Sequence, residues 1–405
     1  MEDKKGLIKS LPFLKIVLGN GFDLHCHLKT KYSDFFNKNK GKYEYILKWS
    51  NKFSYNCHTY VNLNISNHDD FWEPFERFDD VNVWDFYFLY ISLYEKDNSI
   101  NYEKIDSWNW CDIESSIYNS LILEKEKNSP NILWDSVFKI LKGESHLKAI
   151  IGQYNHLLAS VVYKKGGNDV LKNEKVFYTF LLEQLKIFEM EFGNYIDSLH
   201  QGPYGISFGV KPKNFAYYSK FTIEQLCDIE NIVRIDTFNY DTPEIEEIER
   251  LVHNINGDIN NPIFGIDSEF FKDKPGNPRY IFSKTNRRME LDMITPYLIE
   301  KAPFQNVLVF GHSLNKADYS YFFSTLDRMN ITDLSNDNVI VFAFSIYDYD
   351  DEENIKAKLR EGIFQLFRDY SIYKGNNDNP DRLLDALTTQ GKVIMYEIPY
   401  IKINK

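Results

Sequence analysis

The sequence has few cysteines, an excess of acidic over basic residues and no long hydrophobic run. Its four cysteines, Cys26, Cys57, Cys111 and Cys227, show no CxxC spacing, which argues against a structural zinc site and against a disulfide framework. No window approaches the roughly 18 apolar residues of a membrane-spanning helix, and the N-terminal segment contains no signal-peptide core. We therefore expect a cytoplasmic protein with reduced thiols and no membrane contact.

The charge balance bears on the choice of partner. Asp and Glu number 59 against 47 Lys and Arg, a formal net charge of −12, which repels phosphate backbones. We expect no nucleic-acid partner, and no metal, because no carboxylate cluster carries histidine at ligand spacing. The 43% apolar and 16% aromatic residues can bury large cores, and the 405 residues suffice for two or three modules.

Five short apolar runs predict the strands of one mostly parallel sheet. Such sheets are covered on both faces, so their strands are continuously apolar rather than alternating. The predicted strands are Leu14–Leu18, Ile232–Thr237, Val307–Phe310, Val339–Phe344 and Val393–Ile398. This pattern predicts an α/β fold of the Rossmann type.

The sequence between the first and second predicted strands is helical in character. Apolar residues recur three and four apart, most clearly over Val176–Ile196, which predicts an amphipathic helix. We therefore expect an α/β domain formed by residues 1–37 and 231–405. A large helical insertion, residues 38–230, would interrupt this domain and cover its pocket or bind partners.

The first polar block follows the first predicted strand directly. It begins with Gly19, Asn20, Gly21, Phe22 and Asp23. The two glycines allow a sharp turn and a close approach to a ligand, and the next helix would offer free N–H groups to a phosphate. Asp23 would accept hydrogen bonds from ribose hydroxyls or cap that helix. A purely structural turn explains the block equally well.

The second block, Ile235–Glu246, lies where another predicted strand ends. Open α/β sheets bind ligands at the carboxyl ends of their strands. Asn239 and Asp241 would present an amide and a carboxylate to a polar ligand there. Alternatively, Asp241 caps a helix that begins near Pro243.

The third block, Val252–Ile266, predicts a tight turn between two short strands and contains Asn256 and Gly257. His253 lies three residues before Asn256, which on a strand places it on the opposite face. It is therefore not expected to act in the same pocket.

The fourth block, Val307–Phe322, contains a strand that ends at Gly311. His312 and Ser313 follow at the sheet edge, with Asp318 further along. These residues would contact a ligand, or Ser313 would cap the following helix.

Three of the four blocks lie at the carboxyl ends of predicted strands. Because these ends share one edge of a parallel sheet, we expect the three blocks to converge on one crevice. Together they resemble the AbiH family of bacteriophage abortive-infection proteins. The resemblance is carried by Gly19–Asp23, Leu28–Thr30, Tyr32–Phe35, Trp110–Glu114, Gly311–Leu314 and Ala317–Asp318. It implies a role in antiviral defence.

The same blocks are similar, in the same order, to the nucleotide-binding motifs of sirtuins and of sirtuin-like NAD hydrolases. The matching segments are Gly19–Gly21, Thr237–Asp241 and Gly311–Leu314. This resemblance implies a sirtuin-like pocket for NAD or ADP-ribose, with Asn239 and Asp241 beside the nicotinamide ribose and Ser313 on the adenosine side. We expect His312 to join Asn239 and Asp241 as catalytic residues. The residues expected to bind the ligand are Gly19, Asn20, Gly21, Phe22, Asp23, Asn256, Gly257, Gly311, Ser313 and Asp318.

The sequence departs from this pattern at Asn256, where sirtuins and AbiH proteins usually place a histidine. An amide cannot accept a proton at neutral pH. Either Asn239 orients water without a base, or a histidine such as His25 or His312 substitutes, or the pocket binds without hydrolysis. The leading hypothesis is an NAD glycohydrolase that acts during phage infection. The alternative is a non-enzymatic nucleotide or ADP-ribose sensor that signals phage infection to a partner. A phage-derived trigger and self-association into a homo-oligomer are further expected interactions.

Overall fold

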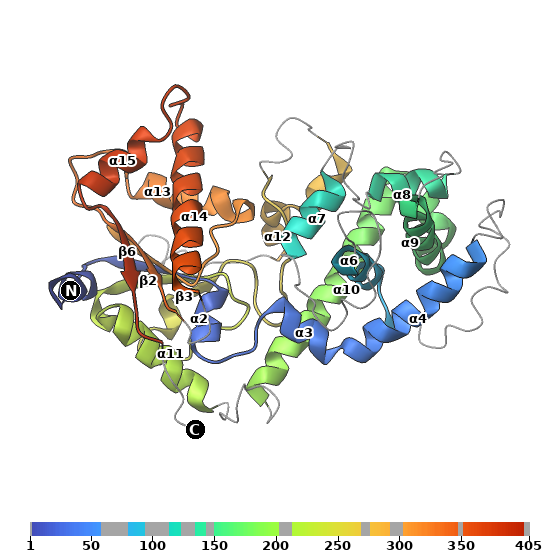
Figure 1. Ribbon diagram of the computed structural model, residues 1–405, viewed down its shortest axis with the longest axis horizontal. Coiled ribbons are helices and arrows are strands. Elements are labelled where there is room, and N and C mark those ends of the chain that lie inside the picture. Colours follow the sequence, from blue (N-terminus) through green and yellow to red (C-terminus); the bar gives the residue numbers. More distant parts are fainter. Residues whose placement is uncertain are drawn as a thin grey trace. The chain divides into compact units, whose positions relative to one another are not determined.

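A computed structural model describes residues 2–57, 80–93, 113–122, 134–142, 150–201, 213–268, 276–291, 303–346 and 351–400 (Figure 1). The chain forms two compact units by its internal contacts. Unit 1 comprises residues 1–31, 193–262 and 288–405, and unit 2 comprises residues 32–192 and 263–287. Trp110, Cys111 and Asp112 of the AbiH-like segment lie outside the described residues.

Unit 1 is built on one six-stranded sheet whose neighbouring strands are all parallel. The strands are β1 (Leu14–Leu18), β2 (Ile232–Thr237), β3 (Val252–Asn254), β4 (Asn306–Phe310), β5 (Ile340–Phe344) and β6 (Val393–Glu397). Their order in the sheet is β3-β2-β1-β4-β5-β6, the same order as in doubly wound α/β sheets. The five strands predicted from apolar runs are all confirmed.

The prediction of two short strands in the third block is wrong. One strand, β3, is present, and Ile266 forms only an isolated bridge with Ser283. Between them, the Asp258 carboxylate accepts the backbone N–H groups of Asn260 and Asn261 at 2.9 and 3.0 Å. These local hydrogen bonds stabilise a turn and compete with a strand ladder.

The sheet is covered by helices because its strands are apolar on both faces. All five residues of β1 are buried. Val17 belongs to a core cluster with Phe322, Leu366 and Leu387. These three residues come from α13 (Tyr319–Arg328), α14 (Glu352–Tyr373) and α15 (Arg382–Thr389). Figure 1 shows these three helices on one side of the sheet and α11 (Lys213–Leu226) on the other.

The remaining elements divide between the units as follows. Unit 1 contains α1 (Glu2–Lys9), α2 (Asn20–His25), α11 (Lys213–Leu226), α13 (Tyr319–Arg328), α14 (Glu352–Tyr373) and α15 (Arg382–Thr389). Unit 2 contains α3 (Tyr32–Lys38), α4 (Lys40–Cys57), α6 (Val83–Leu93), α7 (Ile113–Leu121), α8 (Trp134–Leu141) and α9 (Ile150–Gly166). Two helices, α10 (Glu174–Gln201) and α12 (Lys284–Glu290), contribute residues to both units. The helix predicted over Val176–Ile196 is confirmed within α10.

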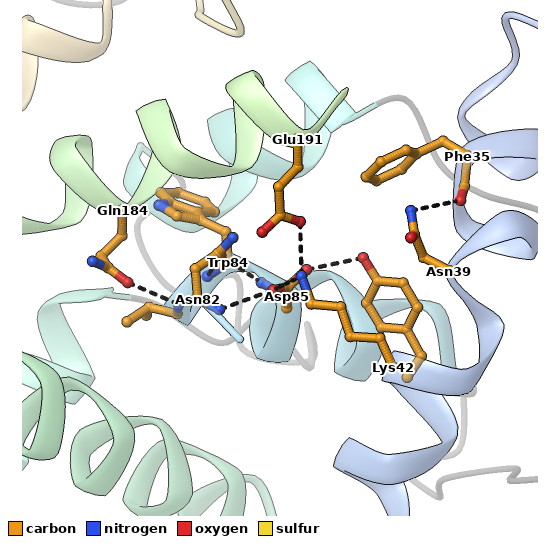
Figure 2. A network of polar contacts seen from close by, with 10 residues as sticks. Phe35, Asn39, Lys42, Asn82, Trp84, Asp85, Gln184 and Glu191 are labelled. Atoms are coloured by element: carbon orange, nitrogen blue, oxygen red, sulfur yellow. Dashed lines mark hydrogen bonds and ion pairs between the residues drawn. The ribbon is translucent and has the colours of Figure 1, made fainter. Parts of the chain in front are cut away.

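In unit 2, a reciprocal capping box fixes the start of α6 (Figure 2). The Asn82 side chain accepts the backbone N–H groups of Trp84 and Asp85 at 2.8 and 3.0 Å. In return, the Asp85 carboxylate accepts the backbone N–H of Asn82 at 2.9 Å. Backbone donors that the helix itself leaves unpaired are thereby satisfied.

The buried Asp85 carboxylate also connects α6 with α4 and α10 (Figure 2). It accepts the Tyr43 hydroxyl at 2.9 Å and lies 2.6 Å from the Lys42 ammonium. Lys42 in turn lies 2.7 Å from Glu191 of α10. Since each charge has a partner, we assign this network to the packing of unit 2.

Candidate functional site

Three turns meet at the carboxyl edge of the sheet in unit 1. They follow β1, β2 and β4, which are adjacent because β1 pairs with both of the others. Backbone hydrogen bonds join the turns directly: Gly19 N–H donates to Phe310 O at 3.0 Å, and Gly21 N–H donates to Gly311 O at 2.8 Å. The expected convergence of these blocks on one edge is therefore present.

The glycines of these turns are required by contact between backbones. A Cβ atom on Gly21 would lie 2.6 Å from Gly311 Cα, and one on Gly19 would lie 2.6 Å from His312 Cα. Gly311 also has a φ of +69°, in the left-handed region that favours glycine. The close approach expected toward a ligand is thus made toward the neighbouring turn.

The amide donors of the first turn are also engaged within the protein. Gly21 N–H is bonded to Gly311 O, and Phe22 N–H donates to Gly19 O at 2.8 Å. These two groups are not the free phosphate donors that the sequence suggested. Helix α2, which follows the turn, is only six residues long.

The side chains of Asp23 and Asn239 meet beneath the turns. The Asn239 amide donates to Asp23 Oδ1 at 2.6 Å and to Gly19 O at 3.2 Å. Asn254 holds this segment by donating to the backbone oxygens of Asn239 and Asp241 at 3.0 and 3.2 Å. Asp23 lies inside α2 and does not cap it, since Gly19 occupies the N-cap position.

The carboxyl group of Asp241 also interacts with that of Asp23. Asp23, Asn239 and Asp241, called here the polar cluster, are all buried. Burial, followed by the charge and hydrogen bond of Asp241, raises the pKa of Asp23 well above its ordinary value. The cluster therefore contains a carboxyl group that retains its proton, next to a second carboxyl group.

His200, at the end of α10, extends this cluster. Its Nε2 lies 3.3 Å from Asp241 Oδ2, and its ring packs edge-on against Phe215. Burial alone would lower the pKa of His200, but the adjacent carboxyl group of Asp241 outweighs this effect and raises the pKa. No sequence signal marks this residue, because His200 belongs to no motif and lies about 40 positions before Asp241.

Asn20 and Thr30 connect the first turn to the segment before α3. The Thr30 hydroxyl donates to Asn20 Oδ1 at 2.5 Å and also hydrogen bonds to Asp23. Tyr195 of α10 donates to Lys29 O at 2.5 Å. The loop that follows α2 is thus held against the site by side chains as well as by backbone bonds.

Asn256 occupies the position at which a histidine was expected, and its side chain is engaged. Its amide oxygen accepts a hydrogen bond from Arg288 at 3.1 Å, and Arg288 also donates to Ile255 O at 2.9 Å. Gly257 follows with a φ of +81°, which explains the glycine there. The arrangement fixes the turn and supplies no proton acceptor.

His253 takes part in a separate buried network. Its Nδ1 lies 3.0 Å from an Arg234 nitrogen and 3.5 Å from Asp236. Asp236 also lies 2.8 Å from the Lys15 ammonium. Although burial would raise the pKa of Asp236, the hydrogen bond from His253 and the charges of Lys15 and Arg234 hold it below its ordinary value.

The fourth block orders its own turn. His312 Nδ1 accepts the backbone N–H of Leu314 at 2.9 Å, and His312 Nε2 lies 3.6 Å from Asp318. The His312 ring also packs edge-on against Phe238. Ser313 is exposed and does not cap the following helix, because Asn315 caps the 3-10 turn Lys316–Asp318.

His25 lies on the side of α2 that faces β4 and β5. Its Nδ1 lies 3.1 Å from the Ser345 hydroxyl, and its ring packs against Phe310 and Tyr400. Burial, with a contribution from His27, lowers the pKa of His25 to about 4. Its imidazole is therefore neutral at physiological pH and engaged in packing.

Neither metal-ligand groups nor membrane spans emerge from the residues that the structure describes. Within them, no three His, Cys, Asp or Glu side chains gather as a metal site. Likewise, none of the described helices has the length and apolarity to cross a membrane.

The fold and the site define an α/β protein with a buried carboxyl–amide cluster at the carboxyl edge of a parallel sheet. A comparison with protein families matches residues 16–341 to the family described as bacteriophage abortive infection AbiH. The chain therefore belongs to the AbiH family, which implies a function in abortive infection. Neither the curated proteins nor the solved structures that were compared gave a match.

Proposed function

We propose that this chain acts in phage defence by hydrolysing the glycosidic bond of NAD or a related nucleotide in the polar cluster. The observation that carries the proposal is the contact of Asp23, Asn239 and Asp241 at the end of adjacent strands. Buried carboxyl groups whose pKa is perturbed are more frequent at active sites than in ordinary cores.

The position of the cluster supports a nucleotide as the ligand. In open α/β sheets, ligands bind beyond the carboxyl ends of the strands where the strand order reverses. That reversal lies between β1 and β4, and the polar cluster is formed by residues that follow β1, one of these two strands, and its other neighbour β2. The similarity of the same segments to sirtuin motifs points to a sirtuin-like arrangement for NAD or ADP-ribose.

The chemistry of the cluster suits cleavage at a ribose carbon. When the bond between C1′ and the nicotinamide nitrogen breaks, both electrons remain on nicotinamide, which leaves as a neutral molecule. Positive charge then develops on the ribose, and an ionised Asp241 stabilises it in a site largely screened from solvent. Water adds to C1′ and releases one proton, which the pair of carboxyl groups can take up.

Asn239 is placed to organise this pair. Its amide nitrogen donates to both Asp23 and Gly19, so the orientation of the side chain is fixed. Its amide oxygen is then an acceptor that can orient the attacking water. His312 supports the site from outside the cluster by holding the Gly311 turn, against which Gly19 packs.

Consumption of NAD by the purified chain tests the proposal. We expect nicotinamide and ADP-ribose to accumulate with the natural sequence, and Asn239→Ala to lower kcat by about 10²-fold, as for loss of one preorganised polar group. Asn194→Ala, the same change at an exposed position of α10, serves as the matched control and should retain activity. If NAD remains intact both with the purified chain and in infected cells, hydrolysis of NAD is not its function.

One observation favours the alternative of a sensor that binds a nucleotide without cleaving it. Asn256 replaces the expected histidine, and its amide is engaged with Arg288. Calorimetry with ADP-ribose and NAD, followed by analysis of the recovered ligand, separates the two functions. Tight binding with intact NAD recovered would indicate a sensor, whereas recovery of nicotinamide would indicate the enzyme.

A further inference from the structure

We propose that His200 is the proton acceptor of this site, and that it acts through Asp241 in place of the histidine missing at Asn256. The inference rests on the proposed function and deepens it. It assigns a role to a residue that lies outside all four motif blocks and belongs to the last turn of α10.

The contact between the two side chains leaves one polar atom of each without a hydrogen-bond partner. His200 Nε2 and Asp241 Oδ2 lie 3.3 Å apart, an ion-pair distance. Both atoms are buried, yet their orientation does not complete a hydrogen bond, so each retains bonding capacity. A buried carboxylate oxygen and imidazole nitrogen with unused capacity are what a substrate hydroxyl or a catalytic water requires.

The other histidines of unit 1 with described side chains are engaged elsewhere. His27 Nδ1 lies 2.9 Å from the Tyr400 hydroxyl. His25 contacts Ser345, and His312 accepts the Leu314 amide while facing Asp318. His253 contacts Arg234 and Asp236. His200 is the histidine that the structure brings to Asp241.

The His200 side chain is more exposed than that of Asp241. The two side chains are 20% and 6% exposed, and Asp23 is buried. A proton accepted in the interior therefore has a short path to solvent through the imidazole. This gradient matches a relay that must return to its starting state after each turnover.

The proposed step conserves atoms and charge. As the C1′–nicotinamide bond breaks, the water oxygen bonds to C1′ and its proton passes to Asp241 Oδ2. The carboxyl group then passes a proton to the neutral His200 Nε2, and the resulting imidazolium releases it to solvent. His200 thus acts as a positioning and relay residue, because Asp241 is the group that meets the water.

The relay predicts a defined pH dependence. His200 accepts a proton only when neutral, so activity should rise with pH through the pKa of His200. Charged groups around the imidazole, Asp241 first, then Glu244 and Asp197, raise this pKa above the ordinary 6.5. The rising limb should therefore be centred above pH 6.5.

The test is a pH profile of NAD hydrolysis by three forms of the full chain. His200→Gln keeps a nitrogen near the position of Nε2 but cannot accept a proton. We expect kcat to fall by about 10²-fold with little change in KM, and the rising limb to disappear. In Glu244→Gln, an exposed charge is removed while the base remains. We expect kcat to be retained and the limb to shift by a few tenths of a pH unit to lower pH.

The outcomes separate this inference from the proposed function. If the natural sequence consumes NAD while His200→Gln retains both kcat and the rising limb, the relay is wrong and the proposed function stands. If the natural sequence consumes no nucleotide, both are overturned. If His200→Gln fails to fold, the pH profile of Glu244→Gln tests the relay instead. A rising limb at the same pH as in the natural sequence would contradict the assignment of this limb to His200.

Discussion

At the scale of single residues, Asp23 has an unusual electrostatic position. Burial and the adjacent Asp241 raise its pKa, so the folded chain binds a proton that the unfolded chain releases. A carboxyl group with a raised folded pKa lowers stability as the pH rises from about its ordinary value of 3.8 toward the folded value. Such a cost is typical of groups retained for function.

We therefore predict that Asp23→Asn stabilises the protein at neutral pH. Asn resembles the protonated carboxyl group and can still accept from Asn239, so about 1.4 kcal/mol should be gained for each unit by which the pKa is raised. Chemical unfolding at pH 7 and near pH 4 measures the effect, which should shrink at the lower pH. The exposed Asp378→Asn is the matched control and should change neither value. A loss of stability that is equal at both pH values would contradict the assignment.

Part of the candidate site could be anticipated from the sequence. Asn239 and Asp241 stood out because they directly follow a strand, and strand ends of a parallel sheet share an edge. Asp23 was recognised as a polar residue of that edge, but its contact with a second carboxyl group depends on side-chain directions. His200 could not be found, because its approach to Asp241 is set by the path of α10 through space rather than by any spacing.

At the scale of elements, the turns after β1 and β4 form one backbone unit. Gly21 and Gly311 approach so closely that neither tolerates a Cβ atom. The sequence predicted a turn at each and left open whether a ligand or the local structure required it. The actual neighbour, another turn, was not apparent until the strand order was known.

This contact predicts opposite effects for the same substitution at two glycines of unit 1. Gly21→Ala should destabilise the chain by about 1–3 kcal/mol, because the new Cβ meets Gly311 Cα. Gly6→Ala, in the middle of α1 with open space around it, should stabilise by about 0.5–1 kcal/mol. Thermal unfolding of both variants measures these changes in stability. Equal changes in the two variants would show that the turn accommodates a Cβ atom at Gly21.

The capping box of α6 gives a second prediction at this scale. Asn82→Ala leaves the backbone N–H groups of Trp84 and Asp85 without their side-chain acceptor and should cost about 1–2 kcal/mol. Asn82→Ser retains a capping oxygen and should recover most of this loss. Urea unfolding followed by tryptophan fluorescence reports on it, since Trp84 and Trp134 are both buried in unit 2. Equal stabilities of Asn82→Ala and Asn82→Ser would argue against a capping role of the Asn82 side chain.

At the scale of the whole molecule, the sequence predicted the positions of the strands better than the arrangement of the segments that connect them. Continuous apolar runs such as Leu14–Leu18 identify buried parallel strands by composition alone. β3 was harder, because it has only three residues, all partly exposed. Helix α10 contributes to both units, which helical periodicity cannot indicate.

Membership in the AbiH family implies a function in abortive infection. We predict that cells expressing the natural sequence resist phage and lose NAD during infection. Cells expressing Asp241→Asn at the same protein level should plate phage as efficiently as cells without the protein. Phage titres and NAD content measured from the same cultures test this. Full protection of cells by the Asp241→Asn chain would show that defence does not depend on the polar cluster.

The most direct test of a nucleotide at this sheet edge is a crystal structure of the Asn239→Ala chain soaked with NAD. The account predicts density for the nicotinamide ribose beside Asp23 and Asp241, with its C1′ within reach of Asp241. A nucleotide bound at another surface, or none at saturating concentration while the chain still binds NAD in solution, would contradict it.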